Sequence, residues 1–387
     1  MVLKLDEMVA TKTPKFLRDP YLEWVAAEGV PVAEDFGVDL MATDVAPWAR
    51  FGVDGAIVHL KGRGDFVSVF ILELPGGGET SPQGHLFEEV VYVLSGHGST
   101  TVEIPGGTKH SFEWAPKSLF ALPFNARYQH FNGSGSEPAR LASTNNLCVV
   151  MKLFRSTEFI FGATYSFAER ALPAAYFSGE GDIIPAPRGR YMWESNFIPD
   201  MGSVELLDNP KRGKGSATLA FILGDGMMHA HSSLMPVGTY KKAHRHGPDY
   251  HVMIIDGEGY SLFWYEGEED FARIDWREGW AFAPPDMMLH QHFNTCARPV
   301  RYMATAIGNS RFPFTERNHK NKLGIDISVK EGGGQIEFED QDPRIHPMYL
   351  EALAATGTQC RMPEFADGEA GVGTLASIQG VVGLNPF

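Results

Sequence analysis

Short apolar stretches separated by glycine and proline make up most of this chain. Residues with high strand preference recur between turn residues, whereas long helical periodicity is scarce. The 42 glycines and 25 prolines are spread along the whole sequence, as is typical of a protein with many turns. The pattern therefore predicts an all-β fold. Helices are expected at residues 15–28, 38–49 and 343–356, the last with Asp342 as a possible N-cap and Gly357 beyond its end.

A segment in the first half of the chain recurs in the second half. At an offset of 161 residues the corresponding pairs are Gln83 and His244, His85 and His246, Glu89 and Tyr250, Gly96 and Gly257, and Gly98 and Gly259. At an offset of 162 residues they are Trp114 and Trp276, Tyr128 and His290, His130 and His292, and Asn132 and Asn294. Two barrel-sized copies with matching turns predict two tandem jelly-roll barrels, each made of two antiparallel sheets.

The repeat also suggests a division of the chain into five parts. A helical N-terminal arm is followed by a first barrel, a connection rich in proline and glycine, a second barrel and a C-terminal extension with a helix. The predicted boundaries are 1–55, 56–160, 161–215, 216–310 and 311–387.

Two histidines of the second copy, His244 and His246, are separated by one residue. In a strand such a pair points to the same face. His290 follows in another apolar strand, so the three imidazoles can converge on one ion inside a barrel. Imidazole suits Fe, Mn, Cu, Ni or Zn, and three such ligands leave coordination positions open. The sequence therefore predicts one divalent transition metal per chain.

The residues around these histidines resemble the two motifs of the cupin superfamily. The matching positions are Gly238, His244, His246 and Gly257 in the first motif, and Gly279, Pro285, His290 and Asn294 in the second. Tyr250 stands where the family has a glutamate, and Met287 replaces a glycine. Three histidines without the glutamate are similar to the all-histidine iron site of the gentisate and salicylate dioxygenase branch. The resemblance implies two double-stranded β-helix barrels and Fe(II), with Mn(II), Ni(II) or Zn(II) as alternatives.

His251 is a candidate fourth ligand. It follows His246 by five residues, a separation that some cupins use for their glutamate. The repeat, however, places Tyr250 at the glutamate position. Neighbouring strand residues face opposite ways, so His251 points outward if Tyr250 points inward and the strand has no bulge.

Three histidines near the predicted ligands are candidates for other roles. His292 shares a face with His290 and can reach the pocket or a ligand, although survival of its counterpart His130 in the first copy favours a structural role. His229 and His231 share a face on the strand before the first motif. Tyr250 and His229 are the candidates for proton transfer, and a partly exposed strand face is the alternative interpretation of the His229 and His231 pair.

The first copy has lost most of these ligands. Gln83 and Tyr128 replace two histidines, and only His85 and Glu89 match the family positions. Such a set is expected to bind an ion weakly. We therefore interpret the first barrel as structural.

Charge and cysteine content narrow the range of partners. A net charge of −15 argues against nucleic acid and against an anionic membrane surface. The three cysteines are far apart and lack the spacing of a disulfide framework or a thiolate metal site. With no long apolar run, a cytoplasmic location is expected. Lys241, Lys242 and Arg245 form a local basic cluster, which would suit a carboxylate or enolate substrate.

Three functions are compatible with these residues. The first is a metal-dependent oxygenase, a dioxygenase by resemblance, acting with dioxygen on a small hydroxylated aromatic or keto acid. The second is a non-oxidative cupin enzyme, that is, a decarboxylase, lyase, isomerase or aminohydrolase. The third is a non-catalytic protein that binds a metal or ligand. A homo-oligomer is expected in each case, because cupin barrels bury their open edges against one another.

Overall fold

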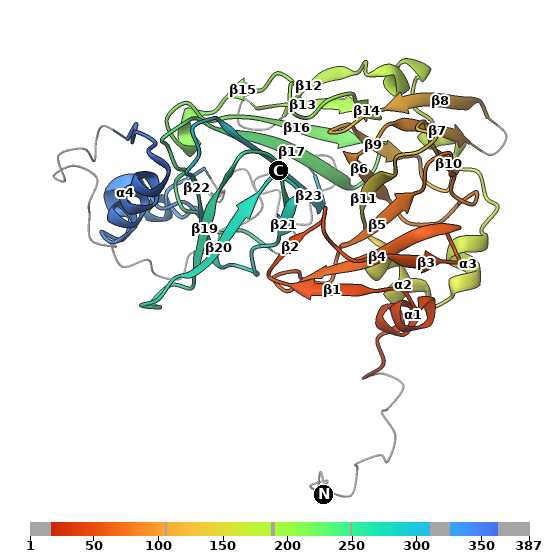
Figure 1. Cartoon of the computed structure of the whole chain (residues 1–387), viewed down its shortest axis with the longest axis horizontal. Coiled ribbons are helices and arrows are strands. Elements are labelled where there is room, and N and C mark those ends of the chain that lie inside the picture. The colour runs from red at the N-terminus through yellow and green to blue at the C-terminus, as the bar shows by residue number, and fades with distance from the viewer. Residues whose placement is uncertain (1–16, 105–106, 187–189, 248–249, 310–325, 363–387) are drawn as a thin grey trace, which may run out of the picture.

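The protein folds into two β-barrels that follow one another along the chain (Figure 1). The structure, a computed structural model, describes residues 17–104, 107–186, 190–247, 250–309 and 326–362. Each barrel combines one large sheet with one sheet of three strands. This arrangement confirms the predicted all-β fold of two tandem jelly-roll barrels.

The large sheet of the first barrel has the strand order β1-β4-β5-β11-β6-β9-β14, with β3 paired to β4. These strands are β1 (Val32–Asp35), β3 (Ala46–Trp48), β4 (Val53–Leu60), β5 (Ser68–Leu74), β6 (Glu89–Ser95), β9 (Leu119–Leu122), β11 (Ala139–Asn145) and β14 (Phe197–Ile198). The small sheet has the order β10-β7-β8 and consists of β7 (Gly98–Glu103), β8 (Lys109–Trp114) and β10 (Arg127–Asn132). Apart from β1 beside β4, the pairs are antiparallel.

The second barrel repeats this plan. Its large sheet has the order β12-β13-β16-β17-β23-β18-β21-β2, with β15 paired to β16. The strands are β2 (Gly37–Asp39), β12 (Asp182–Ala186), β13 (Arg190–Ser195), β15 (Leu207–Asp208), β16 (Ala217–Leu223), β17 (Met228–Met235), β18 (His251–Asp256), β21 (Trp280–Phe282) and β23 (Val300–Ile307). The small sheet has the order β20-β19-β22 and consists of β19 (Glu258–Trp264), β20 (Ala272–Arg277) and β22 (Leu289–Asn294).

The two barrels exchange short strands. β2 comes from the N-terminal region but pairs with β21 of the second barrel, whereas β14 comes from the connection and pairs with β9 of the first. The prediction of a helix at residues 38–49 is therefore wrong, since this segment contains most of β2 and all of β3. Asp39 ends β2 in a turn, because its Oδ1 accepts hydrogen bonds from the backbone of Met41 and Ala42 at 3.0 and 3.2 Å. Pairing with sheet edges outweighs local helix propensity here.

The large sheets of the two barrels pack face to face. Val90 of β6 belongs to the same apolar core as Met253 and Ile255 of β18. Across this contact Thr305 Oγ1 donates a hydrogen bond to Thr144 Oγ1 at 3.2 Å. Alternate residues of β18 therefore face either the other barrel or the interior of their own barrel. The predicted domain boundaries stay predictions; the exchanged strands β2 and β14 lie within the predicted N-terminal arm and the predicted connection.

Within the described part of the chain, four short α-helices lie around the barrels: α1 (Pro20–Glu28), α2 (Leu147–Phe154), α3 (Thr157–Gly162) and α4 (Ile345–Thr356). α1 and α4 confirm the helices predicted at residues 15–28 and 343–356, although both begin later than predicted. α4 lies beside the small sheet of the second barrel (Figure 1), where Tyr349 and Leu353 share a core with Phe293. Among the described residues, every helix is too short or too polar to cross a membrane. Residues 310–325 and 363–387 of the predicted C-terminal extension lie outside the described residues.

Candidate metal centre

Three buried histidines meet inside the second barrel. His244 and His246 precede β18, and His290 lies on β22. The backbone N–H of His244 donates to the carbonyl of His290 at 3.0 Å, and the return bond measures 2.9 Å. This pair of bonds holds the two segments in register, and the ligand nitrogens of all three histidines lie within 4.8 Å of one another. The predicted convergence of two histidines from one segment and a third from another strand is present in the structure.

Two of the three rings are oriented by backbone carbonyls. His246 Nδ1 lies 2.7 Å from the carbonyl oxygen of Gly247, and His290 Nδ1 lies 2.9 Å from that of Met288. A carbonyl only accepts, so each ring carries its proton on Nδ1 and keeps a lone pair on Nε2. Burial lowers the pKa of His246 to about 4 and that of His290 well below its ordinary value. Both are therefore neutral imidazoles, the form that binds metals.

The turn before β22 contains Met287, at the position where the resemblance noted above implies a glycine. Met287 occupies that position with φ 57°, in the left-handed region that glycine adopts without strain. Its backbone N–H donates to the carbonyl of His246 at 3.0 Å. This hydrogen bond thus links the two motifs beside the histidines. Met287 adopts the left-handed conformation although it has a side chain.

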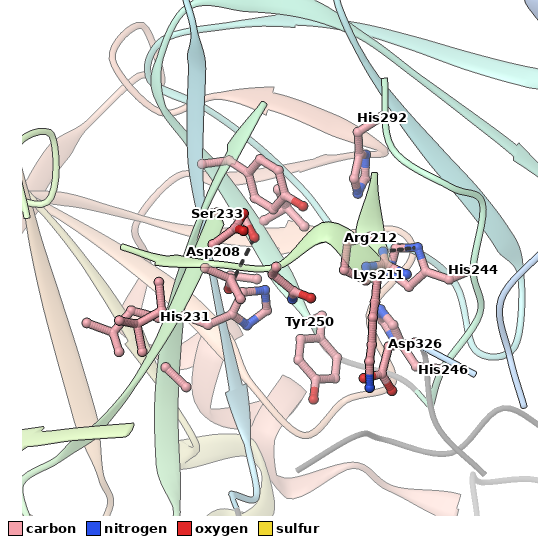
Figure 2. Close-up of a pocket in the computed structure, with 18 of the residues that line it drawn as sticks. Asp208, Lys211, Arg212, His231, Ser233, His244, His246, Tyr250, His292 and Asp326 are labelled. Carbon is pink, nitrogen blue, oxygen red and sulfur yellow. Dashed lines mark hydrogen bonds between the residues drawn. The ribbon is translucent and has the colours of Figure 1, made fainter. Parts of the chain in front are cut away.

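The three histidines open onto a cavity of about 370 Å³ between the two sheets of the second barrel. Tyr250 also lines this cavity, and its ring centroid lies 4.3 Å from that of His246. Figure 2 shows His231 on the opposite side of the cavity from His244 and His246, with Tyr250 between them. Burial holds the pKa of His231 well below its ordinary value, so this ring is also neutral.

Tyr250 and His251 point to opposite sides, as the alternation argument predicts. Tyr250 lines the cavity, whereas His251 shares the face of β18 that carries Met253 and Ile255 toward the first barrel. Among the described residues, His251 is not part of the group of nitrogens that lie within 4.8 Å of one another. A fourth-ligand role for His251 has no support from this geometry.

His229 and His231 share the face of β17 that points into the second barrel. His231 lines the cavity, while His229 is not among the described residues that do so. The ring of His229 lies 5.7 Å from that of Tyr250, centroid to centroid, and that of His231 lies 6.0 Å away. Of the two, His231 is better placed to meet a ligand, although the sequence had favoured His229.

His292 belongs to an arrangement that both barrels share. Trp276 Nε1 donates to Ser261 Oγ at 2.8 Å, and Ser261 Oγ is hydrogen-bonded to His292 Nδ1 at 2.7 Å. In the first barrel the equivalent bonds join Trp114, Thr100 and His130 at 2.9 and 2.8 Å. Repetition in a barrel without the three histidines favours a structural role for this position. His292 nevertheless also lines the cavity.

The equivalent position in the first barrel is occupied by a closed hydrogen-bond network. Tyr128 Oη donates to Glu89 Oε2 at 2.9 Å, His85 Nε2 lies 2.9 Å from the same oxygen, and Ser143 Oγ donates to Glu89 Oε1. Burial raises the pKa of Glu89, but the hydrogen bonds from His85 and Ser143 outweigh it and the net pKa is lowered. Gln83 points elsewhere, donating to the carbonyl of Arg50 at 2.9 Å. The hydrogen bonds to this carboxylate thus come from protein groups, and the structural role of the first barrel stays a prediction.

The three basic residues of the predicted cluster lie differently from what the sequence suggests. Lys241 is buried rather than on a rim, and its Nζ lies 4.9 Å from the ring centroid of Tyr302, which lines the cavity. Lys242 and Arg245 form ion pairs with Glu337 and Glu266. The predicted basic cluster therefore does not form a shared rim.

Arg212 is a cavity residue that the sequence did not reveal. It lies on a 3-10 turn (Pro210–Arg212) in the connection between the barrels, and its Nη2 donates to His244 Nδ1 at 2.7 Å. The turn precedes the first motif by some thirty residues, and its sequence, Pro-Lys-Arg, resembles any solvated basic turn.

Comparisons with known proteins give distant structural similarity only. No protein-family model and no curated protein matches the sequence. Oxalate decarboxylase from Bacillus subtilis at pH 4.6 is 13% identical over 71% of this chain and 77% of its own, with a TM-score of 0.46. A second structure of that enzyme, from a study of its Mn(II) centers, is 12% identical over 71% and 78% with the same score. Vicilin from Capsicum annuum is 13% identical over 70% and 85%, with a TM-score of 0.45.

Similarity at this level carries no conclusion about the chemistry of the site, which rests on the residues described above. The resemblance to the cupin superfamily extends from the two motifs to the two-barrel architecture. The narrower resemblance to gentisate and salicylate dioxygenases stays a prediction, as do the cytoplasmic location and the homo-oligomer.

Proposed function

We propose that the second barrel is the active site of a metal-dependent enzyme that acts, without consuming oxygen, on a small organic anion. The observation that carries this proposal is the group formed by His244, His246 and His290, three buried histidines whose ligand nitrogens lie within 4.8 Å of one another beside a cavity. Neutral imidazoles in this number suit Mn(II), Fe(II), Ni(II) or Zn(II). The donor set therefore fits one divalent transition metal per chain.

The charges around the cavity favour an anionic substrate. Arg212 lines the cavity with 6% of its surface exposed, and Lys241 beside it is 2% exposed. Burial, followed by the charge of Arg212, holds the pKa of Lys241 well below its ordinary value. The carboxylates among the described lining residues are Asp208, which is exposed, and Asp326, which is half-buried. A divalent ion held by three neutral histidines would keep its full positive charge beside the guanidinium of Arg212, so the site would attract an organic anion.

The remaining cavity residues favour proton-transfer chemistry. A divalent ion bound there would supply Lewis acidity toward an oxygen of the substrate. Tyr250 offers a phenol next to His246, and His231 offers a neutral imidazole on the opposite wall. Such groups can donate or accept a proton at a carbon next to a carboxylate, as decarboxylases, lyases and isomerases require. We therefore place the non-oxidative reaction before the dioxygenase that the resemblance implies.

Metal analysis of the full chain tests the first half of this proposal. Protein purified without chelator or nickel affinity is expected to contain one equivalent of Mn, Fe, Ni or Zn by plasma mass spectrometry. His290→Ala is expected to contain none, because it removes one of three ligands. His85→Ala, a histidine of the first barrel, is the matched control and keeps the metal. Absence of metal from the wild type, even after reconstitution, would contradict the proposal.

Turnover tests the second half. The metal-loaded protein is incubated with a panel of small keto, dicarboxylic and hydroxylated aromatic acids, once in air and once without oxygen, while products and oxygen uptake are followed. Turnover without oxygen is the expected result. Turnover only in air would instead support the dioxygenase, and ligand binding without turnover would support a non-catalytic binding protein.

A further inference from the structure

The hydrogen bond at His244 has the opposite polarity from those at the two other histidines. His246 and His290 donate through Nδ1 to carbonyl oxygens at 2.7 and 2.9 Å. At His244 the partner of Nδ1 is Arg212 Nη2, at 2.7 Å. A guanidinium has donors only, so His244 Nδ1 is the acceptor and the neutral ring must carry its proton on Nε2.

This proton lies where a metal ligand would need a lone pair. His244 Nε2 is 3.1 Å from His290 Nε2, which is unprotonated because His290 donates through Nδ1. The four groups therefore form a consistent chain, in which Arg212 donates to His244, His244 donates to His290, and His290 donates to the carbonyl of Met288. Metal-binding histidines usually donate their second N–H to a carbonyl or carboxylate, and a guanidinium in that place works against coordination.

Arg212 is held in place, yet it can be reached from the cavity. Its Nη1 donates to Gln335 Oε1 at 2.9 Å, and Gln335 in turn donates to Glu337 Oε1 at 2.9 Å. The guanidinium lines the same cavity that we assign to the substrate. A carboxylate that enters the cavity would compete with the imidazole for the guanidinium, since charge-assisted bonds between arginine and carboxylates are stronger than bonds to a neutral acceptor.

We propose that Arg212 couples the binding of an organic anion to the binding of the metal. While Arg212 donates to His244, the ring keeps its proton on Nε2 and the site favours the metal-free form. When an anion takes the guanidinium, the proton on Nε2 is released and another occupies Nδ1, so the ring stays neutral and Nε2 becomes a ligand. Anion and metal therefore strengthen each other's binding, with the same factor in both directions. This inference rests on the metal site proposed above, and it makes Arg212 a positioning residue.

Metal affinity of the full chain tests the coupling without any assay of activity. Zn(II) alone is titrated into the metal-free protein in competition with a chromophoric chelator. Arg212→Met is expected to bind Zn(II) roughly 10-fold to 100-fold more tightly than the wild type, the range in which partners of ligand histidines act. Arg301→Met is the matched control, because Arg301 donates to the carbonyls of Met201 and Val204 rather than to a histidine.

Anion dependence gives the second arm of the experiment. Benzoate, a weak chelator, is expected to raise the Zn(II) affinity of the wild type and of Arg301→Met but not that of Arg212→Met. Equal or weaker binding by Arg212→Met, or no effect of benzoate on the wild type, would overturn the inference and leave the metal site standing. Absence of Zn(II) binding from the wild type and all variants would overturn both.

The position of the proton can be measured directly on the metal-free wild type. Nitrogen NMR of protein with labelled histidine is expected to show His244 protonated on Nε2, and His246 and His290 protonated on Nδ1. His244→Asn assigns the signal. An Nδ1-protonated His244 in the wild type would refute the role of Arg212 whatever the behaviour of the variants.

Discussion

Replacing Tyr128 with phenylalanine tests how the first barrel satisfies its buried carboxylate. Tyr128 Oη donates to Glu89 Oε2 at 2.9 Å, and His85 Nε2 lies at the same distance from that oxygen. Glu89 is 2% exposed, so water cannot easily replace a lost donor. The substitution removes only one oxygen atom, which leaves the packing of the ring almost unchanged.

The expected loss follows from the charge of the acceptor. A hydrogen bond to an ionised group contributes about 1.5–3 kcal/mol, so Tyr128→Phe should lower the free energy of unfolding by about 2 kcal/mol at pH 7. Urea unfolding followed by tryptophan fluorescence and circular dichroism measures it, as a lower midpoint with an unchanged slope. Tyr92→Phe is the matched control. Tyr92 is buried on the face of β6 opposite to Glu89 and points toward the second barrel.

At acid pH the free energies of unfolding of the wild type and of Tyr128→Phe should become similar. The pKa of Glu89 in the folded protein lies below its ordinary value, so the donors stabilise the fold above the pKa of the unfolded chain. That stabilisation is lost as the pH falls through the lower, folded-state pKa. The deficit of Tyr128→Phe should therefore shrink toward acid, whereas that of Tyr92→Phe should not. A deficit below about 0.5 kcal/mol at pH 7, or one independent of pH, would refute the network as the reason for this barrel's stability.

Two further substitutions test the contact between the two barrels and the turn that follows β18. Glu88→Ala removes the acceptor of the backbone N–H groups of Met227 and Met228 (2.7 and 2.8 Å) and the partner of Arg170 (2.9 Å), and should cost about 3–5 kcal/mol in the urea assay. Glu88→Gln keeps one acceptor oxygen and should cost less; equal costs would mean that the contact between the barrels does not depend on these bonds. Gly257→Ala places a Cβ 2.6 Å from Val300 Cγ2 at φ 93° and should lower the free energy of unfolding by more than about 1 kcal/mol. An unchanged midpoint for Gly257→Ala would show that the turn after β18 can shift at no cost.

The sequence was most informative where a feature repeats with a fixed period or spacing. Alternation and turn residues predicted two all-β barrels, and spacing brought His244, His246 and His290 together. Alternation also separated Tyr250 from His251 correctly, because no bulge intervenes at the start of β18. Each of these features depends on residues that are close in sequence, or on two copies of one segment that correspond at a nearly constant offset.

Features that depend on long-range contacts left no local signal. β2 and β14 have three and two residues, too few to show a period, so neither their existence nor their exchange between barrels could be predicted. Residues 38–49 looked helical because edge pairing is invisible in a single sequence. Arg212 approaches His244 from a separate segment, and burial of Lys241 depends on the whole barrel around it. Residues that set the charge of a site are therefore harder to predict than its ligands.

The two barrels differ in the charged groups that they bury at equivalent positions. In the first, the carboxylate of Glu89 carries the charge and is stabilised by hydrogen bonds from its protein neighbours. In the second, Tyr250 replaces that carboxylate, and the cavity is lined by neutral histidines, Arg212, Asp208 and Asp326, with Lys241 buried nearby. The three proposed metal ligands carry no charge, so a bound metal would keep its full positive charge and an anionic ligand would offset it. Without a glutamate among its proposed ligands, the second barrel is therefore expected to bind its metal more tightly when an organic anion is present, which is the coupling proposed for Arg212.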